Sequence, residues 1–246
     1  MMLNPWVLSV PSLAVAGTGV AAWAAVHPSA QIYGPTIRVI ERRDAIALTF
    51  DDGPNPAITP RLLDLLDQYN ARATFFVIGR FVRVCPGLAR EIVARGHALG
   101  NHTDTHPNLL WLSRVHIAEE LHCCGDALAQ ATGRAAHWMR PPYGFRGPQL
   151  DRVVRRHGIR GVVLWSVIAH DWRPQPAARL IQRLRYVGGG DIVVLHDGNH
   201  RALGGDRQHV LGALAYWLPR WRDAGLEFVT MDAAMEGVER KRRSRW

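Results

Sequence analysis

The stretch from residue 45 to residue 230 alternates between strand-like and helix-like patterns, and this alternation constrains the fold more than any other feature. Short apolar runs rich in β-branched and aromatic residues are separated by segments whose apolar residues recur at helical spacing. Strict alternation of strands and helices implies a parallel sheet with right-handed crossovers. About seven such units favour an α/β fold of the distorted, closed or nearly closed (β/α)7-type barrel over a doubly wound sheet.

The patterns predict individual elements. Helices begin at N-caps such as Thr59 and Ser113 and end at stops such as Gly133. We expect strands over residues 45–50, 73–78, 137–139, 161–165, 191–195 and 226–230, with residues 98–100 leading into a polar loop, and helices over residues 59–69, 86–95, 113–132, 147–157, 175–186 and 208–224.

The chain of 246 residues, 48% hydrophobic and 21% charged, has the composition of one ordinary globular domain. Its net charge of +9 is spread along the sequence, apart from a basic tail over residues 237–246 that we expect to be solvated. No basic helix interleaved with aromatic residues stands out, so we expect no nucleic-acid partner. Three cysteines, two of them adjacent, make no disulfide framework and no CxxC metal site.

The N-terminal segment is apolar. Residues 1–37 contain no Lys, Arg, Asp or Glu, and residues 5–26 are almost wholly apolar, with Trp6 and Trp23 near the two ends. About 20 apolar residues suffice to cross a bilayer, so we expect residues 1–27 to be a membrane anchor or an uncleaved signal segment, followed by a linker over residues 28–37.

Two alternatives to an anchor stay open. A cleaved signal peptide would ordinarily carry a basic start, which is missing here. A buried N-terminal hairpin is the other alternative, because Pro11, Gly17 and Gly19 weaken a helix. The nearest basic residues follow the segment, so its orientation is not set by charge.

Polar clusters follow the predicted strands five times. In a β/α barrel the chemistry collects at the carboxyl ends of the strands, so these clusters should meet at one face. They are TFDDGP (49–54), NHTDTHP (101–107), RPPYG (140–144), HDW (170–172) and LHDG (195–198).

The first cluster places two adjacent carboxylates, Asp51 and Asp52, at the end of a strand. Side chains alternate along a strand, so the two acids should point in different directions. One of them can then hold a metal while the other moves a proton. Taken alone, the stretch would be interpreted as a surface Asp-Asp-Gly turn.

The second cluster carries His102 and His106, four residues apart. This spacing brings two imidazoles together, a common arrangement for a divalent metal. With a carboxylate from the first cluster they form a set of two histidines and one acid with open positions. The site is not of the thermolysin type, because Thr103 stands where that motif has Glu.

The remaining clusters add groups suited to amide or ester chemistry. Consecutive prolines fix the backbone, so the amide of Tyr143 can be held toward a developing oxyanion. Arg140 can pair with a carboxylate and tune it. His196, directly after a buried strand, is suited to act as a general acid near neutral pH.

Together and in this order, the five motifs resemble the polysaccharide deacetylases of carbohydrate esterase family 4, the NodB-homology domain, over residues 38 to 235. The resemblance implies a distorted (β/α) barrel and a catalytic domain over residues 38–236. One departure lies in the fourth motif, where many members carry an Asp three residues before the Asp-Trp pair and this chain has Ile168.

The resemblance also implies a metal site and a base. Asp52, His102 and His106 would bind a divalent metal, usually zinc, and Asp51 would be the general base. Arg140 would hold Asp51.

On the acid side, the resemblance implies that Asp171 would orient Arg140 and that His196 would protonate the leaving amine. The Tyr143 amide would stabilise the oxyanion, and Leu195 would line a pocket for the acetyl methyl group. Trp172 itself is interpreted as packing at the site wall, with stacking against a substrate sugar as the alternative role. His200, His209 and Asp104 are interpreted as residues outside the chemistry, with Asp104 capping its loop.

From this resemblance we expect a zinc-dependent enzyme that removes N-acetyl groups from an N-acetylglucosamine-containing glycan of the peptidoglycan or chitin type. It would be tethered to the membrane with its catalytic domain outside the cytoplasm, or secreted if the N-terminal segment is cleaved. An amidase acting on a lipid-linked or small N-acyl substrate is one alternative, and an inactive glycan-binding module of the same fold is another.

Overall fold

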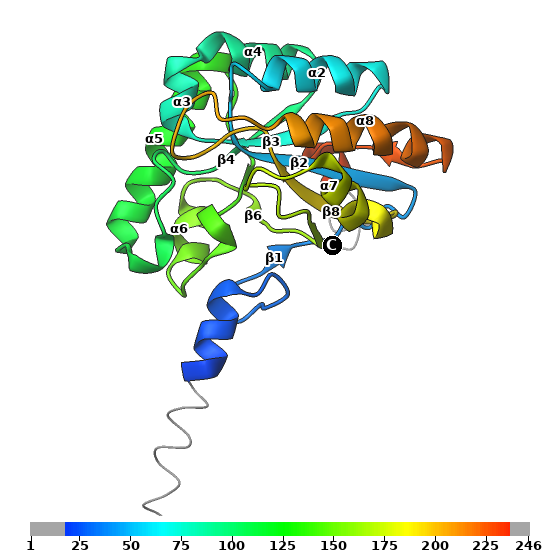
Figure 1. Cartoon of the computed structure of the whole chain (residues 1–246). Coiled ribbons are helices and arrows are strands. Elements are labelled where there is room, and N and C mark those ends of the chain that lie inside the picture. The colour runs from blue at the N-terminus through cyan, green and yellow to red at the C-terminus, as the bar shows by residue number, and fades with distance from the viewer. Residues whose placement is uncertain (1–17, 237–246) are drawn as a thin grey trace, which may run out of the picture.

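The computed structural model describes residues 18–236, in which a curled parallel sheet is covered on its outer side by helices (Figure 1). The strands are β1 Thr36–Ile37, β2 Ala45–Gly53, β3 Ala73–Val77, β4 Ala98–Asn101, β5 Trp138–Met139, β6 Gly161–Val163, β7 Val167–Ile168, β8 Ile192–His196 and β9 Glu227–Phe228. The helices are α2 Thr59–Gln68, α3 Gly79–Val84, α4 Pro86–Ala94, α5 Arg114–Thr132, α6 Leu150–Arg156, α7 Ala177–Arg183 and α8 Gln208–Asp223, with 3₁₀ turns η1 Leu109–Trp111, η2 Pro142–Gly144 and η3 Leu184–Tyr186.

The strands are ordered β1-β6-β5-β4-β3-β2-β8-β7, and β9 pairs with the start of β2. Every strand pair in this order is parallel, as the alternation predicted. Among the described residues the ladder does not run from β7 back to β1. An antiparallel bridge from Val39 to Asp191 instead draws the segment after β1 to the start of β8. The predicted barrel is therefore a parallel half-barrel.

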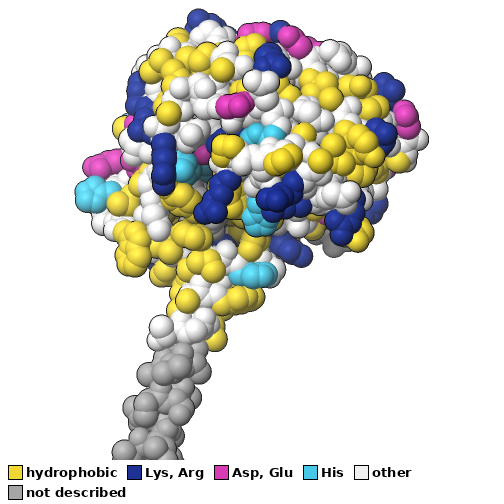
Figure 2. All heavy atoms as spheres, viewed as in Figure 1, with side chains coloured by type: hydrophobic (Ala, Val, Ile, Leu, Met, Phe, Trp, Pro, Cys, Tyr) yellow, Lys and Arg dark blue, Asp and Glu magenta, His cyan; other side chains and the backbone are white. Residues whose placement is uncertain are grey.

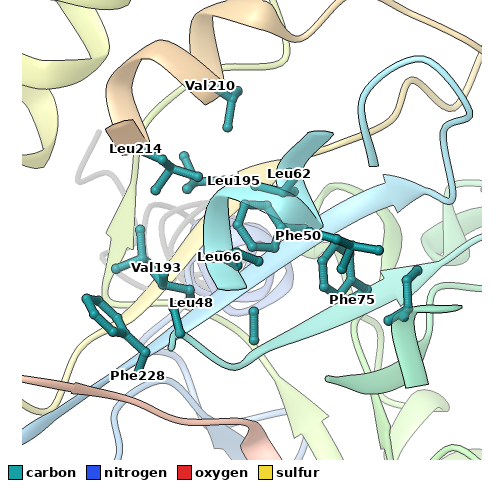
Figure 3. Close-up of a cluster of buried hydrophobic side chains, with 14 of the residues drawn as sticks. Leu48, Phe50, Leu62, Leu66, Phe75, Val193, Leu195, Val210, Leu214 and Phe228 are labelled. Atoms are coloured by element: carbon teal, nitrogen blue, oxygen red, sulfur yellow. The ribbon is translucent and has the colours of Figure 1, made fainter. Parts of the chain in front are cut away.

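Strand β2 lies inside the sheet, between β3 and β8, and all nine of its residues are buried. Ile46, Leu48 and Phe50 face the outer layer, where they pack with side chains from α2, β8 and α8 (Figure 3). Ala45 and Ala47 face the inner side, where larger side chains such as Trp138 fill the curl of the sheet. This alternation places Thr49 and Asp51 on the inner side, at the carboxyl end of the strand.

Helix α5 confirms its predicted start and end. The Ser113 hydroxyl accepts from the backbone N–H of His116, and Gly133 ends the helix with a φ of 69°. The prediction for Thr59 is wrong, because Ile58 is the N-cap of α2. The Thr59 hydroxyl donates instead to the buried carboxyl of Asp197.

The chain around residue 30 is fastened to the domain. Residues 18–26 form a helix that projects from the base of the domain, and Figure 2 shows hydrophobic side chains gathered where it leaves. The buried guanidinium of Arg146 donates to the carbonyl oxygens of His27 and Ala30 at 2.8 and 2.6 Å. The predicted linker over residues 28–37 ends in β1, which pairs with β6, so this segment forms an edge of the domain.

The predicted N-terminal anchor falls mainly on residues 1–17, and the basic tail on residues 237–246; these lie outside the described residues. Within residues 18–236, no helix has the length and apolar character needed to cross a membrane. Figure 2 shows Lys and Arg side chains scattered over the visible face rather than gathered in one patch.

Candidate active site and metal centre

Strand β2 ends in a bulge that separates the two adjacent carboxylates. Asp51 pairs with Phe76 of β3 and Gly53 pairs with Val77, so Asp52 is an extra residue in the ladder. Asp52 has a φ of 69°, a conformation that is uncommon for a residue other than glycine. Strand alternation alone would direct the two acidic side chains to opposite faces of the sheet. The bulge in addition leaves Asp52 unpaired in the ladder, which changes the direction of its side chain.

Asp52, His102 and His106 converge on one point. Their ligand atoms lie within 4.8 Å of one another, and all three residues are buried. Asp52 Oδ1 lies 3.5 Å from His102 Nε2 and 3.2 Å from His106 Nε2, and it has no hydrogen-bond partner among the described residues. A buried carboxylate oxygen facing two imidazole nitrogens matches the donor set of a divalent metal site.

The protonation of these residues suits a metal site. His102 Nδ1 lies 2.7 Å from the carbonyl oxygen of Arg140, so Nδ1 carries the proton and Nε2 offers its lone pair. Burial lowers the pKa of His106 to about 4 and keeps its ring neutral. Burial opposes ionisation of Asp52, but the imidazole groups of His102, His106 and His200 around the carboxyl outweigh burial and hold its pKa well below its usual range.

The loop that carries both histidines is fastened from two sides. Glu120 of α5 accepts from the backbone N–H groups of Asp104 and Thr105 at 2.9 and 2.8 Å. Arg83 of α3 donates to both oxygens of Asp104 at 2.7 Å. Asp104 is therefore not among the metal ligands, as expected, and it acts through an ion pair rather than as a loop cap.

Arg140 lies at the centre of the site with no exposed surface. Its Nη1 donates to Asp51 Oδ1 and to the Thr49 hydroxyl, both at 2.8 Å, and its other nitrogens donate to the carbonyl oxygens of Val163 and Leu164. The predicted contact between Arg140 and Asp51 is present in the structure.

Asp171 contacts His196 rather than Arg140, so the prediction that Asp171 orients Arg140 is wrong. Its Oδ1 lies 2.9 Å from His196 Nδ1, and its Oδ2 accepts from the backbone N–H of His196 at 2.6 Å. Burial alone would lower the pKa of His196, but the carboxylates of Asp171, Asp52 and Asp51 raise it to about 9. His196 is thus protonated at neutral pH, and Nε2 is the atom available to deliver a proton.

Tyr143 occupies a strained turn beside His106, one of the candidate metal ligands. It lies in η2 with a φ of 61°, and its ring meets that of His106 edge-on at 4.8 Å. Among the described residues, six residues other than glycine have positive φ: Asp52, Asn70, Thr103, His106, Tyr143 and His170. Five of these belong to the predicted motifs, so the unusual backbone conformations gather at the site.

The two remaining predictions have different outcomes. Leu195 has no exposed surface and packs in the outer core beside Phe50 and Leu214, so it does not line a pocket that a substrate can reach (Figure 3). Its position follows from strand alternation, because His196 takes the opposite face. Trp172 is 40% exposed, and its ring lies 6.0 Å from that of His196, which puts it at the wall of the site.

His200 was interpreted as lying outside the chemistry, yet it lies beside the candidate metal ligands Asp52 and His106. Its ring stacks on His106 with centroids 4.2 Å apart, and its Nδ1 lies 3.5 Å from Asp52 Oδ2. Its place four residues after His196 was the only signal in the sequence. His209 behaves as expected, since its Nε2 contacts the backbone carbonyl of Asp171 rather than the site.

The fold and the site together define a half-barrel protein in which two histidines and one aspartate that could hold a metal lie beside the ion pairs Arg140–Asp51 and Asp171–His196. The model of the polysaccharide deacetylase family matches residues 39–162. The chain belongs to this family.

A curated relative and solved structures agree with this membership. The chain is 35% identical to a chitooligosaccharide deacetylase from Azorhizobium caulinodans, over 79% of this chain and 96% of the relative. A crystal structure of a peptidoglycan N-acetylglucosamine deacetylase in complex with 4-naphthalen-1-yl-N-oxidanyl-benzamide has a TM-score of 0.75 and 30% identity, over 81% of this chain and 92% of the other.

The fold is also shared with a pseudoenzyme of carbohydrate esterase family 4 from Bacillus anthracis. That structure has a TM-score of 0.73 and 25% identity, over 82% of this chain and 69% of the other. Because the same fold occurs in a pseudoenzyme, the fold alone does not indicate activity, which depends on the side chains of the site.

A tight contact between the first and fifth motifs gives a testable prediction. A Cβ at Gly198 would lie 1.9 Å from the backbone oxygen of Asp52, whereas a Cβ at Gly125 in α5 would meet nothing within 4 Å. We expect Gly198→Ala to lower the free energy of unfolding by about 1–3 kcal/mol and to weaken divalent-metal binding. Gly125→Ala should raise stability by about 0.5–1 kcal/mol. Urea unfolding and metal titration check both, and equal midpoints in the two variants would contradict the contact.

Proposed function

We propose that this protein is a metal-dependent deacetylase that removes N-acetyl groups from an N-acetylglucosamine-containing glycan of the peptidoglycan or chitin type. The observation that carries the proposal is the buried convergence of Asp52, His102 and His106 beside the pairs Arg140–Asp51 and Asp171–His196. Membership in the polysaccharide deacetylase family supports the reaction class, and the names of its relatives support the substrate class.

Asp52 Oδ1 and the Nε2 atoms of His102 and His106 would hold the metal. A set of two imidazoles and one carboxylate suits zinc, which is the ion we propose. When bound, the metal supplies Lewis acidity, which lowers the pKa of a water molecule and polarises the amide carbonyl.

Asp51 is the proposed general base. Arg140 occupies Oδ1 of Asp51, so the proton of the attacking water would pass to Oδ2. The water oxygen bonds to the amide carbon, and the backbone N–H of Tyr143 is the proposed donor to the resulting oxyanion.

His196 is the proposed general acid. Its Nδ1 faces Asp171, so Nε2 would give its proton to the amide nitrogen as the carbon–nitrogen bond breaks. This proton is required, because an amine anion is a very poor leaving group. Acetate and the free amine of the sugar are the products.

We also propose that the protein is attached to a membrane through its N-terminal segment, with the catalytic domain outside the cytoplasm, where such glycans occur. The absence of charged residues over residues 1–37 supports this proposal. Membrane fractionation of the full chain against a variant starting at residue 28 tests it, and equal solubility of the two would refute it.

Acetate release tests the function directly. We expect acetate from N-acetylated chitooligosaccharides or peptidoglycan, loss of release with a chelator, and recovery on addition of zinc. Failure to release acetate from any N-acetylated glycan while the protein holds metal would rule out the proposal. Acetate release from small N-acyl amides in place of glycans would favour the amidase alternative.

Two substitutions separate the roles of the adjacent aspartates and the histidines. Asp51→Asn should leave metal affinity nearly unchanged and lower turnover by about 10²–10⁴-fold, since it removes the base and keeps the ligands. His102→Ala should lose the metal itself. Metal titration and acetate release measure both effects. Equal loss of metal in the two variants would show that Asp51 is a ligand.

The charge on His196 predicts the alkaline side of the pH profile. The pKa of His196 is raised to about 9, so its acid form is present below that value and is lost as the pH rises through it. Asp171→Asn removes the nearest negative charge, and the pKa of His196 should fall by about one unit or more. We expect the alkaline limb of kcat to move to lower pH in this variant. An unchanged limb would mean that another group sets it.

A further inference from the structure

The two metal-facing histidines differ in what orients their rings. His102 Nδ1 is fixed by the carbonyl oxygen of Arg140 at 2.7 Å. His106 Nδ1 is buried and has no hydrogen-bond partner among the described residues. Metal-bound histidines are ordinarily oriented by a hydrogen bond at the second ring nitrogen. His106 therefore needs another constraint.

Aromatic contacts supply this constraint. The ring of His200 lies parallel to that of His106, with centroids 4.2 Å apart and an angle of 13° between the planes. Tyr143 meets the same ring edge-on at 4.8 Å. The rings of Tyr143 and His200 also meet edge-on, at 5.7 Å. Rotation of the His106 ring would break both of its contacts.

His200 also faces the outer oxygen of the metal-facing aspartate. Its Nδ1 lies 3.5 Å from Asp52 Oδ2, whereas Asp52 Oδ1 faces His102 and His106. A donor near Oδ2 favours the orientation that leaves Oδ1 for the metal. His200 is not part of the set of ligand atoms within 4.8 Å of one another, so its place is beside the ligands rather than among them.

The loop that carries His200 is held in place. The guanidinium of Arg80, in α3, donates to the backbone oxygen of His200. Asn55 Nδ2 donates to the carbonyl oxygens of Asp197 and Gly205, both at 2.8 Å, on either side of His200. The stacked ring is therefore presented by anchored backbone.

We propose that His200 is a positioning residue of the metal centre. Its ring takes the place of the missing hydrogen-bond partner of His106 and holds that ligand in its metal-facing orientation. The inference rests on the metal site of the proposed function and adds a residue to it. The face of the ring carries most of the effect, and Nδ1 supports Asp52.

Zinc affinity of the metal-free protein, measured by competition with a chromophoric chelator, tests the proposal. His200→Ala should weaken zinc binding by about 10–100-fold. His200→Phe keeps a flat ring and loses Nδ1, and it should stay within about threefold of the wild type, well short of the loss expected when the partner of a metal-bound histidine is removed. Arg80→Ala, which frees the loop backbone, should weaken binding in the same direction as His200→Ala. His122→Ala, at an exposed position in α5, is the matched control and should bind zinc as the wild type does.

Two outcomes would overturn the proposal. Wild-type zinc affinity in His200→Ala would remove any positioning role. Equal losses in His200→Ala and His200→Phe would show that the ring face does not hold His106. Thermal unfolding in chelator checks that the variants fold. A protein that binds zinc and releases no acetate would refute the proposed function but not this inference, because the measured quantity is metal affinity.

Discussion

The buried guanidinium of Arg140 is the interaction on which the site depends. It joins the proposed base to the sheet, because it bonds Asp51 and Thr49 of β2 together with carbonyl oxygens of the β6 region. The ring of Phe76 lies 4.3 Å beneath it. The backbone carbonyl oxygen of Arg140 contacts Nδ1 of His102 and orients that imidazole ring. Arg140 thus positions both the proposed base, Asp51, and a residue of the proposed metal site, His102. Removing its charge would leave Asp51 buried without a partner, which costs several kcal/mol.

Sequence patterns predicted the parts of the fold that follow regular periodicity. The parallel sheet, the long helix α5 and its two caps, and the meeting of the polar clusters at the strand ends all follow from alternation, helical spacing and the barrel rule. The two-residue strands β1 and β7 and the short helix α3 were missed, because so few residues carry no period.

The site itself could be predicted as a set of residues but not as a set of contacts. Asp52 points toward His102 and His106 because of a bulge and a positive φ, and the sequence Asp-Asp-Gly predicts neither of these backbone features. Asp171 was assigned to Arg140, but the curl of the half-barrel brings β7 beside β8 and so places Asp171 against His196. Thr59 does not cap α2, and its hydroxyl donates to Asp197 instead. A loop places the ring of His200 against His106 at the candidate metal site. Each of these outcomes depends on tertiary packing rather than on local propensity.

Two buried carboxylates of the site each face a cationic side chain. Asp51 faces Arg140 and Asp171 faces the charged His196. The donors around Asp52 fit a divalent metal, which would be its cation. Asp197 is equally buried but faces the neutral Thr59 hydroxyl instead of a cation, and burial raises its pKa to about 7. Negative charge on Asp197 and on the nearby carboxylates of Asp52 and Asp51 is mutually unfavourable. The raised pKa of Asp197 lowers the negative charge that this carboxyl adds where the fifth motif packs against the first.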